Sequence, residues 1–122
     1  MRILLPTACA LTLALAPACV VHVRDGEIQL DGRTHSTVST VRAPLPVGPY
    51  SQAMVVDETL YAAGQIGLDP QTGLLVEGGV AAETRQALAN QSAVLEAAGF
   101  SLRDVVLAQV YLADISDYAA MN

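Results

Sequence analysis

Apolar and polar residues alternate in three stretches of the chain, and this pattern predicts β-strands at residues 36–42, 51–56 and 59–64. The second and third stretches are separated only by the polar residues Asp57 and Glu58. A break of two residues between two alternating runs is typical of a hairpin. The middle of the chain is therefore expected to form a first strand followed by a β-hairpin.

Helical periodicity replaces the alternation between Val80 and Ala98. The residues expected on the buried stripe of this helix are Thr84, Ala87, Leu88, Val94, Leu95 and Ala98, and those expected on its solvated face are Arg85, Gln86, Asn90 and Glu96. Gly99 directly follows the last periodic residue, so it is the expected C-terminal cap.

After a helical turn or tight loop at residues 101–104, the mostly apolar run Val105–Ala113 predicts a central strand with both faces covered. Ser116 or Asp117 is expected to cap a second helix that starts near Tyr118. Strands alternating with helices predict an α+β fold: a two-layer sandwich of a mixed sheet with helices on one face.

Turn-forming residues cluster next to this strand pattern between Ala43 and Gly67. Glycine permits close approach of the backbone, and proline sets the direction of the chain into Tyr50. We therefore expect this stretch to build one wall of a small-molecule pocket.

The N-terminal part of the chain allows several interpretations. Residues 1–21 have one positive charge, an apolar run and small residues before Cys19, which is the layout of a secretory signal and too short for a confident membrane span. A lipid attached to Cys19 and upstream sequence from a misassigned start remain alternatives. Residues 22–35 contain two Asp-Gly turn signals and are read either as a linker or as a short strand between turns.

Charge and composition exclude several classes of function. From Ala43 onward nine acidic residues face only Arg85 and Arg103, which argues against nucleic-acid binding. Both cysteines and both histidines lie before residue 36, so residues 36–122 offer no thiolate or imidazole metal site and no disulfide. A domain this small is expected to gain stability by oligomerisation.

Residues 36–122 resemble the RidA (YjgF) family of reactive-intermediate imine deaminases. The resemblance rests on APLPVGPYSQA, LYAAGQIGLDPQTG, GGVAAETRQALAN, VLEAAG and DVVLAQVYLADISDYAAMN. It implies a chorismate-mutase-like α+β sandwich that forms a homotrimer with pockets between subunits. It also implies hydrolysis of 2-imino acids to 2-keto acids and ammonia, without a metal or organic cofactor.

The resemblance assigns three residues to substrate binding. They are Tyr50 in the GPY turn, Gly64, whose backbone N–H would lie by the substrate carboxylate, and Asn122 on the second helix. A tyrosine packed at an interface and a glycine needed only to leave the strand remain the alternatives for Tyr50 and Gly64. Gln52 and Gln65 are interpreted as structural amides, and Ala63 stands where many members carry a serine or another small residue.

The family's catalytic arginine and glutamate follow the second helix and have no counterpart up to Asn122; Arg85 and Arg103 do not match that arginine. The catalytic residues are therefore unknown, and the resemblance predicts a truncated copy that is inactive alone. The alternative is a non-catalytic trimer that binds a small ligand or a protein. The ribonuclease activity attached by name to parts of the family is not expected, because the domain is acidic and lacks histidine. The location is periplasmic or secreted if residues 1–21 are a signal, and otherwise cytoplasmic.

Overall fold

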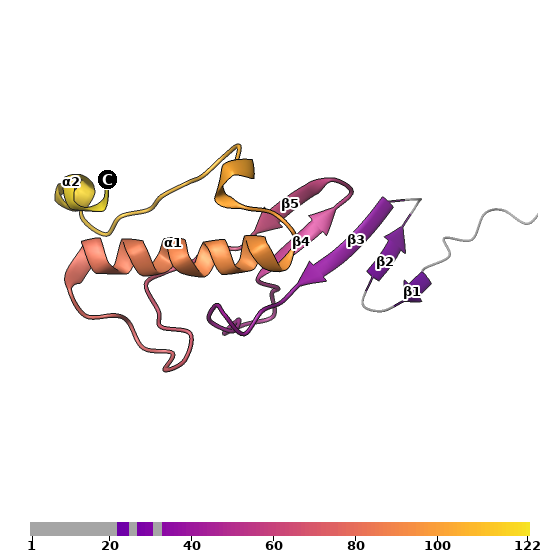
Figure 1. Ribbon diagram of the computed structural model, residues 1–122, viewed down its shortest axis with the longest axis horizontal. Coiled ribbons are helices and arrows are strands. Elements are labelled where there is room, and N and C mark those ends of the chain that lie inside the picture. The colour runs from indigo at the N-terminus through magenta and orange to yellow at the C-terminus, as the bar shows by residue number, and fades with distance from the viewer. Residues whose placement is uncertain (1–21, 25–26, 31–32) are drawn as a thin grey trace, which may run out of the picture.

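A single antiparallel sheet forms one layer of the protein. The computed structural model describes residues 22–24, 27–30 and 33–122 (Figure 1). The strands are β1 (His22–Arg24), β2 (Glu27–Leu30), β3 (Arg33–Val38), β4 (Ala53–Val56) and β5 (Thr59–Ala62). They lie side by side in chain order, and each pairs antiparallel with the next.

The helix α1 (Gly79–Ala97) packs against one face of this sheet at the β3–β5 end. In β3 the residue Val38 is buried while its neighbour Thr37 is exposed, as the alternation requires. The core is small: it consists of Val38, Ala43, Ala53, Ala93 and Val94, with Val55, Leu60 and Ala98 packed around them.

The hairpin and the helix were predicted correctly, with shifted ends. Strands β4 and β5 meet in the register Val56↔Thr59, and the backbone of Asp57 adopts a φ of 53° in the turn between them. The first strand was placed too late, because β3 spans residues 33–38 instead of 36–42. After Val38 the chain leaves the sheet, since Thr40 is bonded to the side chain of Gln52.

Strands β1 and β2 occupy half of the segment 22–35, which was interpreted as either a linker or a short strand. The alternating run Glu27–Leu30 is β2, so the structure agrees with the strand interpretation. The two Asp-Gly pairs and residues 1–21, with the expected signal and Cys19, lie outside the described residues.

Two residues of α1 lie on the opposite side from the one predicted. Leu88 was expected in the buried stripe but is 53% exposed, whereas Asn90 was expected in solvent and is 1% exposed. Part of α1 stays uncovered because the sheet lies beside its C-terminal half and the N-terminal half extends past it (Figure 1). Asn90 is buried because its amide bonds to the carbonyls of Ile66 and Leu68, in the segment after β5. Gly99 ends the helix as predicted: its φ is 81°, and its N–H donates to the carbonyl of Glu96.

The central strand predicted at Val105–Ala113 was wrong. Within residues 33–122, this segment pairs with no strand and runs toward α2 as an extended connection (Figure 1). Val106 is 100% exposed and Tyr111 85% exposed, so the faces expected to be covered are open to solvent. An apolar run forms a strand only where a neighbouring strand offers its backbone groups.

Short helical turns flank this connection. The turn predicted at 101–104 is the 3-10 helix η1 (Leu102–Asp104), closed by a capping box from Ser101. The helix η2 (Ile115–Asp117) is capped by Asp114, whose carboxylate accepts the N–H of Ser116 at 2.8 Å. This bond and a second from the Ser116 hydroxyl lower the pKa of Asp114. The second helix, α2 (Tyr118–Met121), begins where expected, but neither Ser116 nor Asp117 caps it through its side chain.

The α+β class is confirmed. The sheet was predicted to be mixed, but every strand pairing among the described residues is antiparallel. No helix connects one strand to the next in this part of the chain, and such a crossover is the usual link between parallel strands. In the described part of the chain, none of the helices has the length and apolar character needed to span a bilayer.

Candidate functional site

A hollow of about 220 Å³ opens between two irregular segments next to the sheet. The first segment contributes Pro44, Leu45, Val47 and Tyr50, and we call it the first wall. The second contributes Gly64, Gln65, Ile66 and Leu68, and we call it the second wall; Gln52 also lines the hollow. All of these residues except Leu68 lie in the turn-rich stretch Ala43–Gly67, which was expected to build only one wall of a pocket.

Tyr50 is held in the first wall by its own loop. Its N–H donates to the carbonyl of Gly48 at 2.8 Å, and its hydroxyl accepts the N–H of Val47 at 3.4 Å. A Cβ atom added to Gly48 would lie 3.5 Å from the Tyr50 ring, which is an ordinary van der Waals contact. About half of the side chain stays exposed, so the ring is available to a ligand.

Gly64 leaves open space in the second wall. A Cβ placed on it would meet no other part of the protein within 4 Å. A ligand could therefore approach this stretch of backbone closely, which is the property that the resemblance requires of Gly64. The structure thus brings Tyr50 and Gly64 to the same hollow, while their roles in substrate binding stay predictions.

Three residues beyond Gly64, the second wall is pressed against α1 at Gly67. This glycine is buried, and a Cβ on it would lie 2.6 Å from Cα of Glu83. Such a contact is closer than real Cβ atoms tolerate, so only glycine lets the wall sit directly on the helix. The glycine was visible in the sequence, but its contact with Glu83 could not be predicted from it.

Gln52 is confirmed as a structural amide. It is 1% exposed, its Oε1 accepts the N–H of Thr40 at 2.6 Å, and its Nε2 donates to the carbonyls of Thr40, Ala43 and Pro44 at 3.0, 3.3 and 2.8 Å. These bonds tie the segment that enters the first wall to the start of β4.

Asn90 is the residue of the site that the sequence interpretation missed. Its Nδ2 donates to the carbonyls of Ile66 and Leu68 at 3.1 and 2.8 Å, and its Oδ1 accepts from Gln86 at 2.9 Å. A usable signal was present: Asn90 precedes Ala93 and Val94 by three and four residues, which places it on the buried face. Asparagine is also a poor residue for a helix interior unless its amide has a partner.

Asn122 lies apart from these residues. It follows α2, which is packed against α1, and it is not among the residues that line the hollow. Within one copy of the chain, Asn122 therefore does not join Tyr50 and Gly64. Its assignment to substrate binding stays a prediction.

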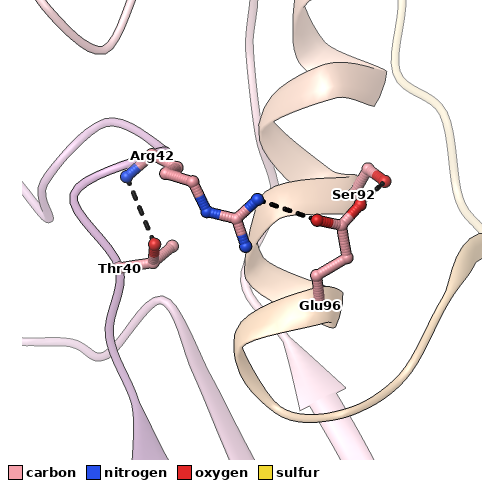
Figure 2. A network of polar contacts seen from close by, with 4 residues as sticks. All are labelled: Thr40, Arg42, Ser92 and Glu96. Carbon is pink, nitrogen blue, oxygen red and sulfur yellow. Dashed lines mark hydrogen bonds and ion pairs between the residues drawn. The ribbon is translucent and has the colours of Figure 1, made fainter.

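An exposed ion pair fastens the entrance of the first wall to α1 (Figure 2). Nη1 of Arg42 lies 2.8 Å from Oε2 of Glu96, whose other oxygen accepts the hydroxyl of Ser92 at 3.0 Å. The N–H of Arg42 donates to the Thr40 hydroxyl at 3.2 Å. Hydrogen bonds from Arg42 and Ser92, together with the charge of Arg42, lower the pKa of Glu96.

The residues that line the hollow carry no charge. They offer a phenol, two amides and backbone groups, which can orient a polar ligand but cannot pair with a carboxylate as an arginine does. Among residues 22–24, 27–30 and 33–122, no group of three or more His, Cys, Asp or Glu side chains could hold a metal ion. The chemistry of this hollow within one copy is therefore binding and orientation.

The described architecture matches a known family. The model of the family Endoribonuclease L-PSP matches residues 40–122. This chain belongs to that family. Solved members include proteins named RidA and YjgF, so the resemblance read from the motifs is confirmed.

Relatives in the family include enzymes with a named activity. The chain is 53% identical over 85 residues to the human 2-iminobutanoate/2-iminopropanoate deaminase, a match that covers 70% of this chain and 62% of the human protein. It is 52% identical over 85 residues to a RutC family protein of Pyrococcus horikoshii, which covers 70% of this chain and 68% of that protein. The chain thus spans about three fifths of the length of the mammalian relative.

Solved structures agree with the fold. RidA from an Antarctic Psychrobacter superposes with a TM-score of 0.68 at 48% identity, covering 70% of this chain and 69% of that one. TdcF of E. coli, solved with bound serine, superposes with a TM-score of 0.68 at 34% identity, covering 70% of this chain and 67% of that one.

Proposed function

We propose that this protein acts as a 2-imino acid deaminase, which hydrolyses reactive enamine/imine intermediates to 2-keto acids and ammonia. The observation that carries the proposal is that Tyr50 and Gly64, assigned to the substrate pocket by resemblance, line one hollow. The 53% identity to a named deaminase supports the same reaction.

In this hollow, the Tyr50 hydroxyl and the backbone beside Gly64 would orient the substrate by hydrogen bonds. A 2-imino acid carries a carboxylate, and none of the lining residues is positively charged. A positively charged partner and the groups that transfer protons must therefore come from elsewhere, such as another copy or further residues. No cofactor is needed for this hydrolysis.

Gly64→Ala tests the pocket with little disturbance of the fold. The added Cβ meets nothing within 4 Å in the protein, and Gly64 does not have a positive φ, so folding should be unchanged while the hollow narrows. We expect weaker binding of a 2-keto acid probe, 2-oxobutyrate, measured by titration. Tyr50→Phe should also weaken binding, whereas Tyr61→Phe, on β5 outside the hollow, should not.

The activity test compares two polypeptides. We expect this chain alone to release little 2-oxobutyrate from iminobutyrate generated by a dehydratase. A version continued past Asn122 with the C-terminal segment of the human relative should accelerate the release. Equal rates from the two polypeptides would contradict the proposal that groups outside this chain complete the site.

We also propose that the protein assembles as a homotrimer. The exposed apolar residues from the end of η1 to the start of α2 support this, namely Val106, Leu107, Val110, Tyr111, Ile115 and Tyr118. An apolar surface of this kind is typical of a contact site. Analytical ultracentrifugation should give three times the mass of one chain, and a monomer at micromolar concentration would disprove the assembly.

The uncharged hollow favours a second candidate function, a non-catalytic member that binds a small ligand or a protein in the same place. Saturable binding of 2-oxobutyrate without turnover by the continued polypeptide would favour this candidate. RNA binding is not proposed, because nine acids against two arginines from Ala43 onward repel phosphates. A filter-binding assay with single-stranded RNA at low salt checks this.

Location is proposed from residues 1–21 alone: periplasmic or secreted if they are a cleaved signal, cytoplasmic otherwise. Mass spectrometry of the native N-terminus distinguishes the two. A new N-terminus just after Ala18 indicates export, and a start near Ser36 removes the argument for it.

A further inference from the structure

Each wall of the hollow is an irregular segment that leaves the sheet. Residues 39–52 before β4 and residues 63–69 after β5 form no strand ladder or helix, apart from an isolated bridge at Leu68. Such segments lack the regular backbone bonds that hold strands in place. A few backbone bonds remain: the N–H of Ala63 donates to the carbonyl of Gln52 at 2.9 Å, and the carbonyl of Gly67 accepts the N–H of Val76 at 2.9 Å. Side chains that bond to the other backbone groups of the walls therefore contribute to the distance between Tyr50 and Gly64.

Two buried amides meet this need, one for each wall. Gln52 donates to three carbonyls at the entrance of the first wall and accepts the N–H of Thr40. Asn90 donates to two carbonyls of the second wall. Both residues are 1% exposed, and they are the two buried polar residues of the described part of the chain.

The contacts of Asn90 fix the direction of its amide. Because its Oδ1 accepts from Gln86, its Nδ2 faces the carbonyls of Ile66 and Leu68. The partners of both amides in the walls are backbone groups instead of side chains. The two amides therefore constrain the path of the main chain in the two walls.

We propose that Gln52 and Asn90 are positioning residues, which independently hold the first and the second wall of the hollow. This inference rests on the proposed function only for its effect on turnover. Tyr50 and Gly64 belong to different walls, so their separation depends on both amides. Loss of one amide loosens its own wall and leaves the other in place.

Hydrogen exchange of backbone amides, followed by NMR in the full chain, tests the proposal directly. Gln52→Met and Asn90→Leu keep the volume near that of the amide and remove its hydrogen bonds. Removing two or more such bonds should speed local exchange roughly tenfold or more. Gln52→Met should do so at Thr40 and Arg42, and Asn90→Leu at Leu68 and Asp69.

Val94→Ala is the matched control for stability. Val94 lies on α1 in the core but makes no hydrogen bond to either wall. The Val94→Ala variant should speed hydrogen exchange in both walls equally, because it acts only by making global unfolding more frequent. If either amide variant produces this uniform pattern at equal stability, the amides act only as core residues and the proposal fails.

Two further measurements keep the proposal testable if a variant does not fold. Gln86→Met leaves both amides in place but removes the bond that orients Asn90, so it should loosen the second wall only. In the unchanged protein, the Thr40 N–H must be protected, because its acceptor is Oε1 of Gln52. Free exchange at Thr40 would overturn the assignment of Gln52.

The effect on turnover is a separate readout. In an active form of the enzyme, each amide variant should raise KM and lower kcat, whereas Val94→Ala should change neither once the folded fraction is accounted for. Wall-specific exchange without any deaminase activity would support the positioning role and refute the proposed reaction. Deaminase activity together with uniform exchange would support the proposed reaction and refute the positioning role.

Discussion

Two apolar regions of this chain have opposite fates. Residues 33–100 contain the β3–β5 part of the sheet, α1 and both walls of the hollow, and their small core is closed, with Val94 0% exposed. Residues 105–118 are more apolar in sequence, yet most of their large side chains are exposed. The difference shows that an apolar pattern specifies what a segment can bury, whereas burial depends on a partner.

The partner is present for the first region and absent for the second within one described chain. Strand β4 has β3 and β5 on its two sides, and α1 covers one face. The extended segment after η1 has no neighbouring strand among residues 33–122. Four measurements test this contrast, beginning with the one that should have the largest effect.

Gly67→Ala should cause the largest loss of stability. The new Cβ would lie 2.6 Å from Cα of Glu83, and a helix backbone cannot move aside as a flexible side chain can. Overpacking of this kind costs about 3 kcal/mol. Urea unfolding measures it, and Gly64→Ala, whose Cβ meets nothing within 4 Å, is the matched control. Equal loss in both variants would mean that the contact with α1 is not formed.

Val94→Ala and Val106→Ala compare the same change in the two regions. Val94 is 0% exposed and Val106 100% exposed. Thermal unfolding should show a loss of about 2 kcal/mol for Val94→Ala and less than about 0.5 kcal/mol for Val106→Ala in the isolated chain. If Val106→Ala costs as much, and increasingly so at higher protein concentration, the second region is covered in an assembly.

Gly99→Ala should cost about 1 kcal/mol, because Gly99 has a φ of 81° that alanine adopts poorly. The loss should appear as fraying of the end of α1 in circular dichroism as well as in urea unfolding. Gly73 has a similar φ of 69° in an exposed turn outside the core. The loss of stability in Gly73→Ala therefore measures backbone strain without the loss of a helix cap. If Gly99→Ala left the stability unchanged, α1 would have to end at another residue.

The ion pair of Arg42 and Glu96 should have the smallest effect, since both side chains are about half exposed. The pKa of Glu96 is lowered in the folded protein, so the pair stabilises the fold above the ordinary carboxyl value of 4.5 and loses this effect as the pH falls below it. Arg42→Met should therefore reduce stability slightly at neutral pH and not at acidic pH.

The control for this measurement is Arg85→Met, which removes an exposed arginine of α1 that forms no such pair. Its effect should not change with pH in the acidic range. A pH dependence shared by both variants would point to overall charge instead of the pair. High salt should shrink the Arg42→Met effect, because exposed pairs are screened.

Much of the fold could be predicted because its signals are local. The hairpin needs only alternation and a two-residue break, and α1 needs only its periodicity and Gly99. The candidate site was predictable in part: turn chemistry located the Ala43–Gly67 stretch and the motifs singled out Tyr50 and Gly64. Asn90 was missed because a polar residue on a helix is expected in solvent unless its acceptors are known, and those acceptors lie 22 and 24 residues earlier in the chain.

The amino-acid sequence was enough to predict the family, the hairpin, the main helix and most of the segment that lines the hollow. Each depends on residues close together along the chain, whose preferences act before any long-range contact forms. The long-range packing decided that Leu88 is exposed, that Gln52 and Asn90 bond to opposite walls, and that residues 105–113 find no partner strand among the described residues. These outcomes depend on which backbone groups and surfaces lie within reach, and that is set by packing between distant parts of the chain.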